Sequence, residues 1–162
     1  ALGLQVDVLV NNAGYGVPGR YAATDWAAQR GFLQVLVTAV AELTHRLLPG
    51  MIARRFGRVL NVASLAALVP AAPGHTLYAA SKAFLVKFSE ALAGECAAEG
   101  VHVTAVCPGF TDTDLVAGSI DNIMKKTGRS REQAISELSK HNPQGRLVTP
   151  AEVAYTVLWL CG

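Results

Sequence analysis

Apolar positions along the chain occur in two kinds of run. Short runs rich in Val and Leu predict strands that are buried on both faces, and longer runs with apolar side chains every three or four residues predict helices. The predicted strands are Asp7–Asn11, Arg58–Ser64 and Val101–Cys107. Strands that alternate with helices are typical of a parallel sheet joined by right-handed crossovers. The pattern therefore predicts an α/β fold with a doubly wound (Rossmann-like) parallel sheet.

Two long helices are predicted between these strands. The first begins at Asp25, and Pro49–Gly50 should break or kink it before a short turn that ends at Arg55. Its predicted core face consists of Phe32, Val35, Leu36, Val40, Leu43 and Leu47. The second helix is predicted to be capped by Thr76 and to stop at Gly100. Its predicted core face consists of Leu85, Phe88 and Leu92.

The last third of the chain contains fewer apolar positions. Residues 111–142 are polar and interrupted by glycines, and they predict a single helix that starts at Ser130. The segment Thr149-Pro-Ala-Glu152 has the residues of a capping box with Pro at the first helical position. It predicts a final helix that runs to Leu160.

Composition narrows the classes of protein. With 162 residues, 51% hydrophobic and 16% charged, the chain is long and apolar enough for one packed domain and is not disordered. The net charge of +2 without a basic stripe argues against nucleic acid as a partner. No uninterrupted apolar run reaches the length of a membrane span, and no secretion signal is visible, so neither a membrane partner nor export is expected.

The cysteines and histidines do not predict a metal site. Cys96, Cys107 and Cys161 are odd in number and widely spaced, which fits neither a disulfide framework nor a CxxC ligand pair. We expect each to be a small buried or half-buried side chain in a reducing cytoplasm. The four histidines also lack the spacing of zinc ligands.

Polar and glycine-rich segments follow all three predicted strands. They are Asn11–Gly14, Asn61–Ser64 and Cys107–Gly109. Ligands bind at the carboxyl ends of the strands in open parallel sheets. We therefore expect these three segments to face one crevice.

Tyr78 and Lys82 are the strongest candidates for catalysis. Their i,i+4 spacing places the phenol and the ammonium on one face of a helix. An ammonium about 4 Å from the phenol oxygen would lower the pKa of the phenol by roughly three units, which suits a general acid or base near neutral pH. By itself such a pair is more often a solvated Lys beside a half-buried Tyr. Ser64, which lies 14 residues before Tyr78 at the end of a strand, could donate to a carbonyl oxygen; the alternative is a turn-capping serine.

Four motifs together resemble the signature of the short-chain dehydrogenase/reductase family. In chain order they are Leu9-Val-Asn-Asn-Ala-Gly14, Gly57-Arg-Val-Leu-Asn-Val-Ala-Ser64, Tyr78-Ala-Ala-Ser-Lys82 and Pro108-Gly-Phe-Thr-Asp-Thr113. The resemblance covers essentially the whole chain. It implies that Tyr78 is the proton donor or acceptor, that Ser64 orients the substrate oxygen, and that Lys82 lowers the pKa of the tyrosine and binds the nicotinamide ribose.

The resemblance also implies a cofactor, NAD or NADP, and its contacts. Asn12, Ala13 and Gly14 would line the adenine-ribose side of the cofactor. The residues implied to hold the nicotinamide carboxamide and its neighbouring phosphate are Pro108, Gly109, Thr111 and Thr113. Hydride would then pass between the nicotinamide and a small-molecule ketone or secondary alcohol.

A glycine-rich segment near the start of the chain imitates a dinucleotide fingerprint. Gly14, Gly16 and Gly19 have the spacing of GxGxxG after a strand. That fingerprint requires a helix to begin within it, with the pyrophosphate at the helix N-terminus. Pro18 precedes the third glycine, and helical periodicity begins only near Asp25. We therefore predict that this segment is not the phosphate site.

The chain departs from the family pattern in two ways. The phosphate-binding motif, the first βα units and the last strand are missing, so residues 1–162 are expected to form a single partial dinucleotide-binding and catalytic domain that is inactive in isolation. In addition, Leu36 stands where the family has an Asn that completes a catalytic tetrad, which places the proton relay in question.

The segments Thr127–Ala134 and Gly145–Val153 resemble hydroxyacyl dehydrogenases and ketoreductases, which suggests a 3-oxoacyl or 3-hydroxyacyl substrate. The basic residues Lys125, Lys126, Arg129 and Arg131 could meet a carrier phosphate, although such a cluster is more often a solvated face. A homodimer or homotetramer is expected by analogy. The alternative to an enzyme is a non-catalytic relative that acts as a binding or assembly subunit.

Overall fold

The computed structural model describes residues 5–71 and 73–162. The chain divides into two compact units. The first extends to Cys107 and includes Leu160–Gly162, and the second comprises Pro108–Trp159. The organisation of residues 1–162 as one partial domain stays a prediction.

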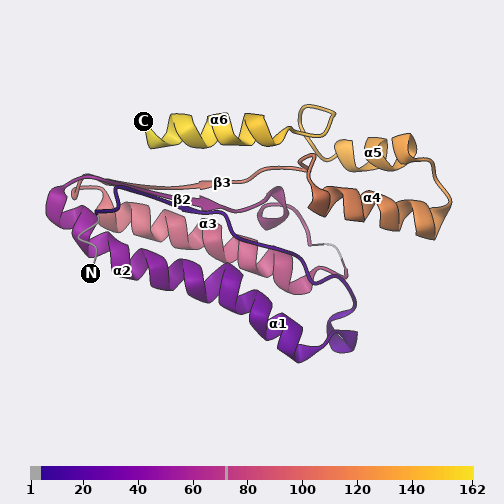
Figure 1. Ribbon diagram of the computed structural model, residues 1–162, viewed down its shortest axis with the longest axis horizontal. Helices are drawn as coiled ribbons and strands as arrows, with labels where there is room; N and C mark the ends of the chain where they lie inside the picture. The colour runs from indigo at the N-terminus through magenta and orange to yellow at the C-terminus, as the bar shows by residue number, and fades with distance from the viewer. Residues whose placement is uncertain (1–4, 72) are drawn as a thin grey trace. The chain divides into compact units, whose positions relative to one another are not determined.

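The first unit contains a parallel sheet of the strands β1 (Val8–Asn11), β2 (Gly57–Val62) and β3 (Val101–Val106), in that order. Asn11 pairs with Asn61 and Val62 pairs with Val106, so the carboxyl ends of the strands lie at one edge. Helices α2 and α3 lie on the same face of the sheet (Figure 1). Right-handed crossovers that advance in one direction require this arrangement. The predicted α/β parallel sheet is confirmed.

The first long helical run begins where the sequence predicts. Helix α1 (Trp26–Leu33) is capped by the Asp25 side chain, which accepts a hydrogen bond from Ala28 N at 2.9 Å. A π-helical segment, Gln34–Thr38, joins it to helix α2 (Ala39–Arg54).

The predicted break at Pro49–Gly50 is wrong, because α2 continues through Pro49 and ends at Arg54. Proline removes one backbone donor, so α2 lacks one intrahelical hydrogen bond at Pro49. Met51 is fully buried in the core next to the sheet, which holds the last turn in place. Arg55, in the left-handed conformation, then ends the helix.

The π-helical segment was not predicted, and it changes which side chains face inward. Through and after this segment the buried residues Phe32, Leu36, Val40 and Thr44 follow one another at steps of four. An additional residue in one turn rotates the stripe, so Thr44 is buried and Leu43 is 46% exposed. The expectation that Leu43 belongs to the core is therefore wrong.

The helical run Trp26–Arg54, 29 residues long, is long and apolar enough to cross a membrane by length and composition alone. This segment contains no long apolar run and is apolar only on average, so the pattern of apolar runs along the chain did not predict it. The finding is weak evidence for a membrane span, since a core helix passes the same test. Phe32, Leu36 and Val40 are buried within the first unit.

Helix α3 (Thr76–Cys96) crosses from β2 to β3. Thr76 is its first residue and not its cap, because the N-cap position is occupied by His75, which makes no side-chain capping bond. Leu85 and Leu92 are buried as predicted, and Phe88 is partly buried against them. The chain then turns at Gly100, whose φ of +73° favours glycine.

The second unit contains α4 (Asp114–Thr127), α5 (Arg131–Ser139) and α6 (Pro150–Cys161) up to Trp159. Helix α4 was not predicted, because the glycine at 118 and many polar residues hide its short apolar stripe. Val116 and Ile120 of that stripe are buried with Ala134 of α5. The predicted capping box at Thr149 and Glu152 is confirmed. The predicted helix start at Ser130 is also confirmed, and a second capping box forms there between Ser130 and Gln133.

Candidate active site

Three polar side chains are buried beneath the carboxyl ends of the strands. Asn11 Nδ2 donates to Asn61 Oδ1 at 2.8 Å, and Asn61 Nδ2 donates to Ser89 Oγ at 2.8 Å. Ser89 Oγ in turn donates to the carbonyl oxygen of Leu85 at 2.7 Å. Buried polar groups need hydrogen-bond partners, and here the partners lie on β1, β2 and α3. These bonds therefore fix the position of α3, which carries Tyr78 and Lys82, along the strands of the sheet.

Lys82 is buried at the edge of the sheet. It is only 6% exposed, and its Nζ donates to the carbonyl oxygen of Val62, the last residue of β2, at 2.7 Å. The same Nζ lies 5.7 Å from the centre of the Tyr78 ring. The Tyr78 ring and the Lys82 ammonium therefore lie on one face of α3, and the catalytic roles assigned to them stay predictions.

The surroundings of Lys82 disfavour its charge. Burial lowers the pKa of Lys82 from 10.5 to about 8, and the neighbouring Cys107 opposes that shift. An ammonium has three donors, and the described contacts use one of them, on Val62. Two donors therefore remain for a ligand.

Ser64 follows β2 and begins a short 3₁₀ turn, Leu65–Ala67. Its Oγ accepts a hydrogen bond from Ala66 N at 3.2 Å, so the turn-capping role considered from sequence is real. That role uses the oxygen as an acceptor and leaves the hydroxyl proton available for donation. Capping and orienting a substrate oxygen are therefore compatible in one side chain.

Cys107 lies beside both Ser64 and Lys82. Burial raises the pKa of its thiol, while a backbone hydrogen bond from Ser64 and the charge of Lys82 act in the opposite direction. The sequence predicted a small, buried or half-buried side chain at the end of a strand, and Cys107 is half-buried directly after β3.

The segment after β1 is open to solvent next to Lys82. Asn12, Ala13 and Gly14 are all exposed. A Cβ atom on Gly14 would lie 3.9 Å from Lys82 Nζ and 3.8 Å from Leu36 Cγ. The structure thus brings the predicted adenine-side segment to the ammonium that is predicted to bind a ribose.

Leu36 is 1% exposed and lies in the π-helical segment. Its side chain offers neither a donor nor an acceptor next to Gly14 and Lys82. Where the family pattern has an Asn, this chain therefore has a buried apolar side chain that cannot form a hydrogen bond.

The second unit contains the four predicted nicotinamide-side residues Pro108, Gly109, Thr111 and Thr113. The Thr111 hydroxyl donates to the Gly109 carbonyl at 3.1 Å, and the Thr113 hydroxyl donates to the Thr111 carbonyl at 3.2 Å. Thr111 also forms an isolated parallel bridge with Val148. That these residues face the same crevice as Tyr78 stays a prediction.

Three other features were candidates for binding a ligand. In the glycine-rich segment Gly14–Gly19 no helix begins, which agrees with the prediction that it is not a dinucleotide fingerprint. Of the basic cluster, Arg129 and Arg131 lie within 4 Å of Glu137 and Asp121, at 3.9 and 3.7 Å. Within residues 5–71 and 73–162, no group of three His, Cys, Asp or Glu side chains could hold a metal ion.

Comparison with known proteins gives consistent matches along the chain. Residues 3–162 match the family described as enoyl-(acyl carrier protein) reductase. The chain is 32% identical to oxidoreductase UcpA of Escherichia coli strain K12 over 96% of its length. It is also 32% identical to the 3-oxoacyl-[acyl-carrier-protein] reductase FabG of Chlamydia muridarum over 96% of its length. The chain spans 58% of the length of each of these two relatives.

A solved structure has the same fold. The structure of the F189W actinorhodin polyketide ketoreductase with NADPH matches with a TM-score of 0.86 and 34% identity. The match covers 98% of this chain and 61% of the ketoreductase.

Proposed function

The chain belongs to the short-chain dehydrogenase/reductase family, and we propose that the full-length gene product interconverts a ketone and a secondary alcohol by hydride transfer with NAD(H) or NADP(H). The observation that carries this proposal is the buried ammonium of Lys82 beside the ring of Tyr78. A buried Lys costs stability, and a purely structural helix has no need of one at this position. Perturbed ionisable groups at the ligand-binding edge of a sheet favour a catalytic role.

The residues present fit a nicotinamide cofactor. Lys82 retains two donors for the two hydroxyls of a ribose, and the exposed backbone at Asn12–Gly14 lies next to it. Gly14 has no side chain to obstruct the approach. Pro108, Gly109, Thr111 and Thr113 are proposed to hold the nicotinamide end. The solved ketoreductase is described with NADPH, and its similarity supports this cofactor class.

In the reductive direction, a nicotinamide held by Lys82 and by residues 108–113 would supply the hydride that the carbonyl carbon receives. Tyr78 gives its phenolic proton to the carbonyl oxygen, which becomes the hydroxyl of the product. Ser64 donates a hydrogen bond to the same oxygen as negative charge develops there. Lys82 stabilises the tyrosinate that remains, and solvent restores its proton. The oxidative direction reverses each of these transfers.

We propose a 3-oxoacyl or 3-hydroxyacyl compound as the substrate class. Similarity to proteins named as an acyl-carrier reductase and a polyketide ketoreductase supports it. The exposed Lys125 and Lys126 at the end of α4 offer positive charge that a carrier phosphate could meet. Among residues 5–71 and 73–162, the ion pairs of this basic cluster are those of Arg129 and Arg131. We further propose that the protein is cytoplasmic, in keeping with three free cysteines among the described residues. We also propose that it is a homodimer or homotetramer.

The experiment is a turnover assay on the purified full-length gene product. NADH and NADPH are offered separately with a panel of 3-oxoacyl thioesters, simple ketones and sugar ketones, and loss of reduced nicotinamide is followed by absorbance. We expect saturable turnover with at least one thioester. Saturable cofactor binding without turnover on any carbonyl would instead support the alternative of a non-catalytic binding subunit.

A further inference from the structure

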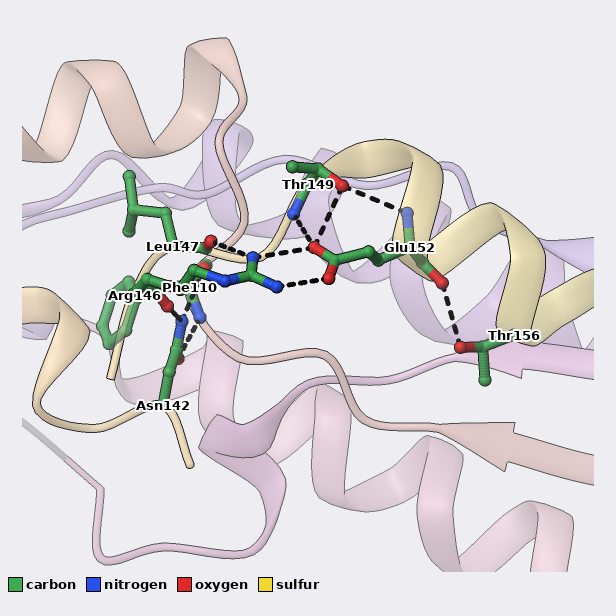
Figure 2. Close-up of polar contacts among 7 residues, drawn as sticks. All are labelled: Phe110, Asn142, Arg146, Leu147, Thr149, Glu152 and Thr156. Carbon is green, nitrogen blue, oxygen red and sulfur yellow. Dashed lines mark hydrogen bonds and ion pairs between the residues drawn. The ribbon is translucent and has the colours of Figure 1, made fainter. Parts of the chain in front are cut away.

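The backbone around Phe110 in the second unit is held by one side-chain amide. Asn142 Oδ1 accepts a hydrogen bond from Phe110 N at 2.8 Å, and Asn142 Nδ2 donates to the Phe110 carbonyl at 2.8 Å (Figure 2). The second Nδ2 proton goes to the Arg146 carbonyl at 2.7 Å. Asn142 is 4% exposed. Its amide therefore pairs with both backbone groups of Phe110, as a neighbouring strand would.

The other side of this contact is also fixed. Val148 N donates to the Phe110 carbonyl at 3.0 Å, and Asp112 N donates to the Val148 carbonyl at 2.8 Å. Arg146 is held by a two-pronged ion pair with Glu152, at 2.5 and 2.9 Å (Figure 2). The Arg146 guanidinium also donates to the Leu147 carbonyl at 3.0 Å. The residues that bind the Phe110 backbone are thus anchored to the first turn of α6.

The close approach of Asn142 also explains why position 109 is a glycine. A Cβ atom on Gly109 would overlap Asn142 Oδ1. Nothing larger than glycine fits at position 109 while the amide of Asn142 is in place. Gly109 and Asn142 are therefore a matched pair, 33 residues apart in the sequence.

We propose that Asn142 is a positioning residue that sets the backbone of Pro108–Thr113 for the nicotinamide end of the cofactor. The proposal rests on the proposed function, which assigns that segment to the nicotinamide. Asparagine suits the role because its planar amide carries an acceptor and two donors, all of which are used. An aspartate would keep the bond from Phe110 N but would place its second oxygen against two carbonyl oxygens. A leucine of similar shape would make none of the three bonds.

The test compares ligands with and without the nicotinamide. In the full-length gene product, Asn142→Leu should weaken binding of NADH or NADPH by about tenfold, the scale of one to two net hydrogen bonds. Binding of ADP-ribose or adenosine 2′,5′-bisphosphate, which lack the nicotinamide, should change by less than about twofold. Asn142→Asp should lie between the wild type and Asn142→Leu. The matched control is Asn122→Leu, an exposed asparagine in the same unit, and it should change neither affinity.

A double-mutant cycle provides a second measurement. Gly109→Ala should weaken dinucleotide binding strongly in the wild type and clearly less in an Asn142→Ala background, because the overlap with Oδ1 is then gone. This comparison remains informative if Asn142→Leu proves too unstable to purify.

Three outcomes would overturn the inference. Equal weakening of ADP-ribose and dinucleotide would show that Asn142 has only a general structural role. An Asn142→Leu protein that behaves like Asn122→Leu, or equal penalties for Gly109→Ala in both backgrounds, would show that the contact does not position the segment. A wild-type protein that binds neither NADH nor NADPH would refute the proposed function itself, and this inference would fail with it.

Discussion

Replacing Lys82 by Met should stabilise the protein near neutral pH while it abolishes activity. The lowering of the Lys82 pKa from 10.5 to about 8 corresponds to about 3 kcal/mol of unfavourable free energy for the buried ammonium below pH 8. Methionine has a similar shape and no charge to desolvate. It loses the hydrogen bond to the Val62 carbonyl, which costs about 1 kcal/mol. We therefore expect Lys82→Met to be about 2 kcal/mol more stable at pH 7.

The sign of this effect should depend on pH. Because the pKa of the folded state lies below that of the unfolded state, the unfolded chain binds more protons between about pH 8 and 10.5. The stability of the wild type should therefore rise through that window relative to the variant. By pH 10 most of the advantage of Lys82→Met should be gone, since the wild-type side chain is then neutral when folded.

The assay is urea unfolding of the full-length gene product at pH 7 and pH 10, with Lys82→Met compared with the wild type. Lys87→Met is the matched control on the same helix, because the Lys87 side chain is 79% exposed in its pair with Glu90. It should change stability by less than about 0.5 kcal/mol at either pH. A Lys82→Met protein that is less stable than the wild type at pH 7, with no change in the difference at pH 10, would refute the reasoning.

Three further predictions concern other parts of the chain. Leu36→Asn should leave turnover unchanged or raise it, measured as kcat, because an amide there would reach the surroundings of Gly14 and Lys82; a clear loss of kcat in a folded protein would show that Leu36 acts as a core residue. Gly100→Ala should lower the free energy of unfolding by about 2 kcal/mol or more, since its φ is +73° and the Cβ would overlap the Arg55 carbonyl. Gly94→Ala, in the interior of α3 with open space around it, should raise it by about 0.5–1 kcal/mol, and equal effects of the two would contradict the structure. Arg146 lowers the pKa of Glu152 from 4.5 to about 2, so the stabilising effect of the pair should persist above pH 4.5 and disappear as the pH falls through 2; Glu152→Gln should remove that acid dependence in thermal unfolding, and an unchanged pH profile would contradict the assignment.

The strands and the catalytic candidates were predictable because their signals are local. Each strand is a short apolar run with Asn, Ser or Cys at its end or within two residues after it, and parallel pairing then places these ends at one edge. The i,i+4 spacing of Tyr78 and Lys82 requires only a helix to bring the side chains together. The burial of Lys82 was not predictable in the same way, because it depends on the carbonyl of Val62 from a different element.

The features that the sequence did not predict depend on contacts between residues far apart in the chain. The π-helical segment at Gln34–Thr38 changes the stripe of the first long helix, and nothing in the local pattern specifies the additional residue in that turn. Pro49 is tolerated because Met51 holds the end of the helix in the core. Asn142 binds Phe110 across 32 residues, and an asparagine before a proline reads in sequence as an ordinary turn residue.

Transfer of a labelled hydride tests the central claim most directly. Reduced nicotinamide cofactor carrying deuterium at both C4 positions is incubated with the full-length gene product and the preferred carbonyl substrate, and the alcohol is analysed by mass spectrometry. We expect one deuterium on the carbinol carbon of the product. We also expect that Tyr78→Phe lowers the rate about a hundredfold or more and retains cofactor binding. An alcohol that forms without deuterium, or a Tyr78→Phe protein that turns over within a few-fold of the wild type, would contradict the proposed reaction.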